Sequence, residues 1–117
     1  MSTPSQQAYR DVEPLQALAA LEEGAVLVDV REPAEWDAGH VPSARHIPLA
    51  QLAARSAELP VTRPLVVICR SGNRSAFAAR MLATAHPDVS NVSGGMRAWA
   101  EVGLPVVARG GGQGFVA

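Results

Sequence analysis

Residues 65–75 read LVVICRSGNRS, which joins the most hydrophobic predicted strand of the chain to a short polar loop that contains glycine. The run from Leu65 to Ile68 is short, rich in β-branched residues and apolar throughout, as is typical of a strand buried on both faces of a parallel sheet. The polar loop begins at Cys69, and an apolar helical pattern follows it from Ala78. Because ligands of open α/β sheets bind where strands end, this stretch predicts both the fold class and the place of a site.

Further strands and helices are predicted on either side of this stretch. Residues 25–30 read AVLVDV and predict a second buried strand. Weaker strand patterns cover residues 44–47 and 89–92, a short edge strand is predicted near Tyr9, and residues 33–38 predict a short helix. Four other helices are predicted from apolar or small residues at helical spacing: Leu15, Leu18 and Ala19; Leu49, Leu52, Ala53, Ser56 and Leu59; Ala78, Met81, Leu82 and Ala85; and Met96, Trp99 and Ala100. The alternation predicts an α/β fold with a central parallel sheet of about five short strands and helices on both faces.

The chain has the length of one domain. Its 117 residues suffice to bury a core without metals or disulfides. We place the domain at residues 8–108, after an N-terminal extension at residues 1–7. Residues 109–117 are rich in glycine and lack a periodic pattern, so we expect a flexible tail.

Composition excludes several classes of function. A net charge of −1 gives no broad attraction to nucleic acid or to an anionic membrane. All ten basic residues are arginine, which excludes Schiff-base chemistry and the phosphate-loop lysine. The single cysteine cannot form a disulfide within the chain. Because the first residues are polar and no apolar run could span a bilayer, we expect a cytoplasmic protein, and without a long amphipathic seam we expect a monomer.

Cys69 is the residue of the loop with chemistry of its own. If the loop curls at Gly72, successive backbone N–H groups converge at the start of the next helix and form an anion-binding nest. Such surroundings, with Arg70 and Arg74 nearby, lower the pKa of a thiol from its usual value of about 8.5 and favour the nucleophilic thiolate. The alternative is that Cys69 is a small buried side chain at the end of a strand. The two arginines and the glycine that follow favour the reactive interpretation.

Three ordered motifs, which together span most of the chain, resemble the rhodanese family of single-domain sulfurtransferases. They are VDVREP, EW and GHVP at residues 28–33, 35–36 and 39–42; CRSGNRS at residues 69–75; and GG, Trp99 and GLPV at residues 94–95, 99 and 103–106. The second motif looks like the family's active-site loop. Val41 and Ser43 depart from the commoner isoleucine and glycine of the first motif, at positions that do not touch the proposed chemistry.

The resemblance implies that Cys69 is catalytic and carries a persulfide. Its thiolate would attack the outer sulfur of a donor such as thiosulfate, and the persulfide would pass that sulfur to cyanide or to a thiol. Backbone N–H groups would stabilise the terminal sulfur, and the two arginines of the loop would orient an oxyanion donor. The predicted substrate-binding residues are therefore Arg70, Ser71, Gly72, Asn73, Arg74 and Ser75. No cofactor is implied, and a sulfur-relay protein is a further candidate partner.

Two other functions remain open. Phosphatases of this fold place five residues between the cysteine and an arginine, whereas four residues separate Cys69 from Arg74 and Ser75 stands where a phosphatase has its arginine. The shorter loop suits one sulfur atom better than a tetrahedral phosphate. The second alternative is a sulfur-delivery or protein-binding module with little activity on free thiosulfate.

Three residues outside the loop are predicted to support it. Asp29 and Arg31 end the first buried strand, where we expect Asp29 to pair with an arginine or to accept backbone N–H groups. By the family resemblance, His40 braces the turn after the short helix at residues 33–38. The alternative role for His40 is that of a catalytic base, which attack by a thiolate does not need. The histidines and the cysteine lack metal-ligand spacing, so no metal site is predicted, and His46 has no evident partner.

Overall fold

The computed structural model describes residues 8–117, and the predicted N-terminal extension at residues 1–7 lies outside them. Strands alternate with helices along the chain. The strands are β1 (Arg10–Val12), β2 (Val26–Asp29), β3 (Arg45–His46), β4 (Leu65–Ile68) and β5 (Val89–Val92). The helices are α1 (Pro14–Glu22), α2 (Pro33–Ala38), α3 (Leu52–Arg55), α4 (Asn73–Leu82) and α5 (Gly95–Glu101), with the 3₁₀ turns η1 (Leu49–Gln51) and η2 (Ser56–Glu58) on either side of α3.

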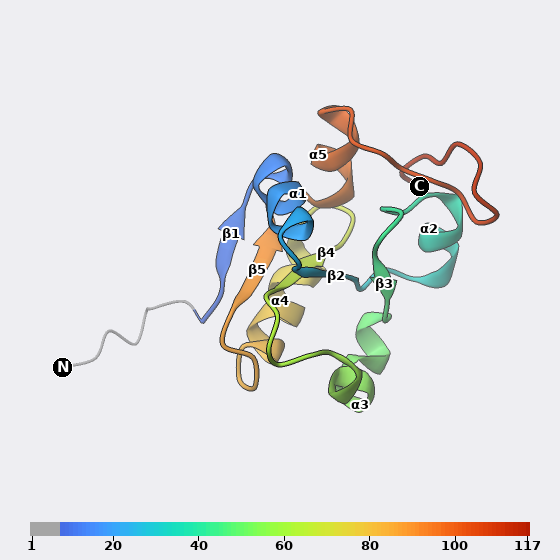
Figure 1. The fold of residues 1–117 in the computed structure, drawn as a ribbon. Coiled ribbons are helices and arrows are strands. Elements are labelled where there is room, and N and C mark those ends of the chain that lie inside the picture. Colours follow the sequence, from blue (N-terminus) through green and yellow to red (C-terminus); the bar gives the residue numbers. More distant parts are fainter. Residues whose placement is uncertain (1–7) are drawn as a thin grey trace.

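The five strands form one parallel sheet in the order β1-β5-β4-β2-β3, which confirms the predicted fold class (Figure 1). The most hydrophobic strand, β4, lies at the centre, where Val67 pairs with Val28 of β2 and with Asn91 of β5. Both β2 and β4 are buried at every position. Because parallel strands all point the same way, the segments that follow β2, β4 and β5 meet at one edge of the sheet.

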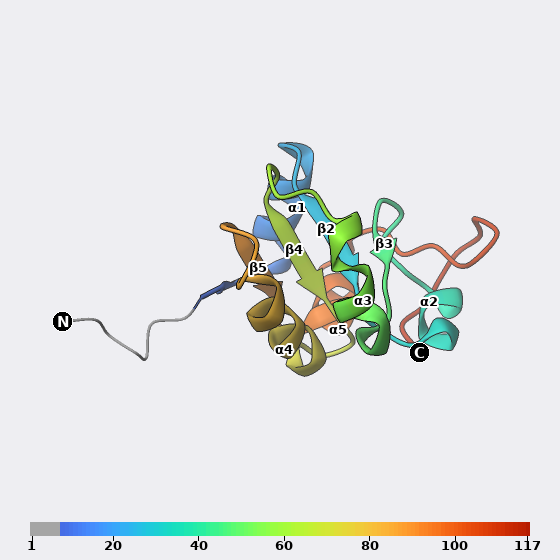
Figure 2. The ribbon, with the colours of Figure 1, turned by 90° about the horizontal axis from the view of Figure 1, so that it is seen from below.

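Helices cover both faces of the sheet, with α1 and α5 on one face and α3 and α4 on the other (Figures 1 and 2). Successive side chains of β4 pack alternately into the cores on the two faces of the sheet, because side chains of a strand alternate between its faces. Val66 and Ile68 lie in the core that contains Trp99 of α5, whereas Val67 and Cys69 lie in the core beneath α4. The chain therefore leaves β4 with Cys69 on the α4 side.

Two predicted helices differ from the structure in detail. In α1, the predicted stripe of Leu15, Leu18 and Ala19 is wrong at two positions, because Leu15 is 60% exposed and Ala19 is exposed as well. Ala17 is buried instead, in the core that α1 shares with α5. The second segment, residues 49–59, divides into η1, α3 and η2 rather than forming one helix. Within residues 8–117, no helix is long and apolar enough to cross a membrane.

The glycine-rich tail has defined contacts that its composition does not predict. The N–H of Gly114 donates to the carbonyl of Val106 at 3.0 Å, and the N–H of Phe115 donates to that of Ala38 at 3.0 Å. At Gly114, a Cβ atom would lie 2.9 Å from the Cα of Gly39. The backbones therefore touch at this point, which a residue with a side chain could not allow. The tail folds back along the end of α2.

A buried ion pair fixes the end of β2. The side chains of Asp29 and Arg31 are both 0% exposed, and Arg31 Nη2 lies 2.7 Å from Asp29 Oδ2. The same Nη2 donates to the carbonyl of Gly39 at 2.8 Å, where α2 ends. The pair therefore ties the sheet edge to α2.

We expect Asp29→Asn to lower the free energy of unfolding by about 3–5 kcal/mol, because the guanidinium of Arg31 would stay buried without a counter-ion. Urea denaturation at neutral pH measures this loss. The matched control is Asp88→Asn, which breaks the exposed pair between Arg10 and Asp88 and should cost no more than about 1 kcal/mol. Equal losses in the two variants would contradict the stabilising role of the buried pair.

Candidate active site

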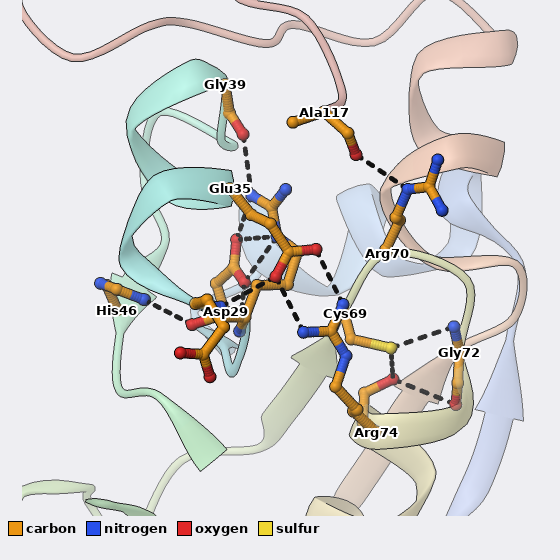
Figure 3. Close-up of polar contacts among 12 residues, drawn as sticks. Asp29, Glu35, Gly39, His46, Cys69, Arg70, Gly72, Arg74 and Ala117 are labelled. Carbon is orange, nitrogen blue, oxygen red and sulfur yellow. Dashed lines mark hydrogen bonds and ion pairs between the residues drawn. The ribbon is translucent and has the colours of Figure 1, made fainter. Parts of the chain in front are cut away.

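The loop after β4 curls back on itself and leads directly into α4. Gly72 makes this turn with φ at +111°, in the left-handed region that glycine adopts without strain, and α4 begins at Asn73. The helix thus begins five residues before the predicted stripe at Ala78, because the polar residues of the loop form its first turn. This geometry brings the sulfur of Cys69 back toward the start of α4 (Figure 3).

Several donors converge on the Cys69 sulfur. The N–H of Gly72 donates to Sγ at 3.0 Å, and Ser75 Oγ lies 3.2 Å from the same atom. The backbone N–H groups of Ser71 and Ser75 also lower the pKa of the Cys69 thiol. Cys69 is itself only 1% exposed, so its donors come from the protein and not from bulk water. The sulfur therefore accepts from a backbone N–H and from a hydroxyl at the start of α4.

Two opposing effects determine how readily Cys69 ionises. Burial raises the pKa of the thiol, because a charged sulfur loses hydration. The hydroxyl of Ser75 and the backbone N–H groups of Ser75, Gly72 and Ser71 lower it by donating to the thiolate. The net result is a pKa below the ordinary value for a cysteine. The arrangement can therefore present a thiolate, the nucleophilic form of the side chain.

Arg74 is held by a residue that sequence reasoning did not place in the site. Its Nη1 and Nη2 each lie 2.8 Å from an oxygen of Glu35, a two-point contact that links α4 to α2 (Figure 3). Hydrogen bonding to Arg74 lowers the pKa of Glu35 from 4.5 to about 2. Each terminal nitrogen of Arg74 thus donates one hydrogen bond to Glu35, and the pair connects the start of α4 to α2. The only signal for Glu35 in the sequence is its place in the first motif.

Arg70 is the exposed arginine of the loop. Its Nε donates to a main-chain oxygen of Ala117 at 2.8 Å, so the tail reaches the loop at this point (Figure 3). The ion pairs found among residues 8–117 include Arg74 but not Arg70. The side chains of Ser71 and Asn73 are likewise exposed. Of the two loop arginines, Arg70 is therefore the more exposed, whereas Arg74 has both terminal nitrogens paired with a carboxylate.

The histidines near the site serve α2 and not the sulfur. His40 Nδ1 lies 2.7 Å from the carbonyl of Trp36, and the two rings stack with their centroids 3.6 Å apart. His46 stacks with Trp36 as well, at 4.8 Å, and its Nε2 lies 2.8 Å from the carbonyl of Arg31. No pattern in the sequence indicates this partner for His46. These contacts hold α2 against β2 and β3 beside the loop. In residues 8–117, no cluster of three metal-ligating side chains is found.

Comparison with known proteins agrees with this geometry. Residues 13–102 match the rhodanese-like domain family. The chain is 41% identical over 99 residues to a sulfurtransferase from Allochromatium vinosum, covering 84% of this chain and 92% of that protein. It is 38% identical over 92 residues to the thiosulfate sulfurtransferase GlpE of Pseudomonas syringae pv. syringae, covering 78% and 87%. A crystal structure of a rhodanese-related protein from Thermoplasma volcanium superimposes with a TM-score of 0.79 at 32% identity, covering 85% of this chain and 98% of that one.

The family match and the likeness to a solved rhodanese-related protein agree with the parallel sheet described above, and the chain belongs to the rhodanese-like domain family. At the level of the family, the relatives support a sulfurtransferase.

Ser75→Ala should raise the pKa of the Cys69 thiol, because the thiolate loses its hydroxyl donor. The rate of alkylation by iodoacetamide, measured against pH, reports this pKa, and the midpoint should move upward by about one unit. Ser71→Ala is the matched control, because it removes an exposed hydroxyl and keeps the backbone N–H. An unchanged midpoint in Ser75→Ala would contradict the assigned role of the hydroxyl.

The Glu35–Arg74 pair predicts a distinct pH dependence of stability. Because the pKa of Glu35 is depressed from 4.5 to about 2, its charge stabilises the fold above pH 4.5, and this contribution is lost as the pH falls toward 2. The difference in unfolding free energy between the wild type and Glu35→Gln should therefore be constant near neutrality. It should decrease as the pH falls from 4.5 to about 2. Urea denaturation at a series of pH values measures it. A difference that stays constant down to pH 2 would refute the pairing.

Proposed function

We propose that this protein is a sulfurtransferase that carries sulfane sulfur as a persulfide on Cys69, from thiosulfate or a persulfide donor to cyanide or a thiol. The observation that supports it most directly is the convergence of donors on the sulfur, with the N–H of Gly72 at 3.0 Å and the hydroxyl of Ser75 at 3.2 Å. A site built to stabilise a sulfur anion suits a reaction in which sulfur is charged before and after transfer.

In the first step, the Cys69 thiolate attacks the outer sulfur of thiosulfate. A sulfur–sulfur bond forms to Cys69, the bond between the two sulfurs of thiosulfate breaks, and its electron pair leaves with sulfite. In the second step, the carbon of cyanide attacks the terminal sulfur of the persulfide. The carbon–sulfur bond forms, the Cys69 sulfur–sulfur bond breaks, and its electron pair returns to the thiolate. The negative charge balances in both steps, and no external base is required.

Arg70 is the side chain that we assign to the anionic donor. It is exposed on the loop, and among residues 8–117 its hydrogen bond runs from Nε to a main-chain oxygen of Ala117, which leaves its two terminal nitrogens for an oxyanion. Arg74 has a different role in this proposal, because its terminal nitrogens are bound to Glu35. It fixes the start of α4, and its charge lies close enough to interact with the Cys69 thiolate.

The test is formation of thiocyanate from thiosulfate and cyanide. We expect Cys69→Ser to abolish activity, and the mass of the wild-type protein to increase by one sulfur atom after treatment with thiosulfate alone.

Arg70→Ala should raise KM for thiosulfate about tenfold, because a charge-assisted hydrogen bond is lost. Arg63→Ala is its control, since it removes the same charge at the amino end of β4, where Arg63 bonds Gly24.

Activity that survives Cys69→Ser would refute the persulfide on Cys69. A protein that gains sulfur only from a persulfide-bearing partner protein, and never from thiosulfate, would instead be the sulfur-delivery module that the sequence left open. Equal effects of Arg70→Ala and Arg63→Ala would show that Arg70 acts through net charge and not by binding the donor.

A further inference from the structure

The start of α5 contacts the back of the active-site loop. The N–H of Met96 donates to the carbonyl of Cys69 at 2.7 Å, and the N–H of Arg97 donates to the carbonyl of Arg70 at 3.0 Å. These N–H groups belong to the first turn of α5, where no carbonyl of the helix itself is available to accept from them. Two consecutive carbonyls of the loop are thereby directed toward α5.

A planar trans peptide transmits this orientation to the sulfur. The carbonyl of Arg70 and the N–H of Ser71 belong to one peptide unit and point in opposite directions. With the carbonyl held by α5, the N–H of Ser71 is turned to the opposite side, and this N–H is one of the groups that lower the pKa of the Cys69 thiol. The contacts behind the loop therefore set the direction of a donor in front of it.

Gly95 is the residue that makes this approach possible. It adopts φ of +57°, in the left-handed region, and α5 begins at this position. A Cβ atom here would lie 2.4 Å from the carbonyl oxygen of Cys69 and 2.7 Å from the carbonyl carbon and oxygen of Arg70. Any residue other than glycine must therefore push the loop away from α5.

We infer that Gly95 is a positioning residue for Cys69, which lets α5 hold the carbonyls of Cys69 and Arg70 so that the loop's N–H groups face the sulfur. The inference refines the proposed function by assigning control of the nucleophile to α5, an element that does not contact the sulfur itself. It rests on the loop geometry, so its test does not require sulfur transfer.

The experiment compares Gly95→Ala with Gly103→Ala by the pH dependence of Cys69 alkylation. Gly103 has φ of +82° just beyond the other end of α5 and nothing within 4 Å of an added Cβ, so its substitution imposes backbone strain without displacing the loop. Gly95→Ala should raise the midpoint by about one unit, as expected for a lost hydrogen bond to a charged sulfur. Gly103→Ala should leave the midpoint unchanged. A wild-type midpoint in folded Gly95→Ala overturns the inference.

A second pair of variants tests the same inference if Gly95→Ala does not fold. Arg97→Pro removes the N–H that holds the carbonyl of Arg70, and proline is tolerated in the first turn of a helix. Arg97→Ala removes the same exposed side chain and keeps the N–H. The midpoint should rise in Arg97→Pro relative to Arg97→Ala, and equal midpoints overturn the inference. Thiocyanate formation by the wild type, measured separately, shows whether a failure belongs to this inference or to the proposed function.

Discussion

Oriented dipoles around one buried sulfur atom are the constraint on which the rest of this structure depends. Cys69 is 1% exposed, and burial by itself favours the neutral thiol. The hydroxyl of Ser75 and the N–H groups of the loop reverse that preference, and no cationic side chain of residues 8–117 is hydrogen-bonded to the sulfur. A buried cation would carry its own desolvation cost, whereas peptide dipoles fixed by the fold do not reorganise when charge develops. The loop can hold this shape because it is supported from behind by α5 and across its front by the contact of Arg74 with Glu35.

Much of this arrangement could be predicted from the sequence, since it depends on local patterns. Strand β4 is apolar throughout and β2 is apolar up to Asp29, because both faces of the central sheet are covered, and such runs are visible without a structure. The polar loop with Gly72 predicts a turn, and a turn between a strand and a helix has few conformations that leave N–H groups pointing inward. The order of strands and helices then fixes the edge of the sheet at which the loop must lie.

The parts that could not be predicted depend on contacts between distant residues. Glu35 and Arg74 are 39 positions apart, and nothing in the local sequence around either residue indicates that the two side chains will form an ion pair. The same is true of the tail, in which glycine suggests freedom of movement but Gly114 permits close packing against Gly39. In α1, Leu15 is exposed and Ala17 is buried in the core shared with α5, because the local spacing of apolar residues does not show which face of a helix meets a distant element.

The hydroxyl of Ser75 has one hydrogen and two acceptors, since its oxygen lies 3.2 Å from the Cys69 sulfur and 3.2 Å from the carbonyl of Gly72. Rotation about a single bond moves that hydrogen from one acceptor to the other while every heavy atom stays in place. An ionised sulfur attracts the hydrogen, and an uncharged one releases it to the carbonyl. The protein can thus follow a change in sulfur charge on the timescale of a side-chain rotation, with no displacement of its backbone.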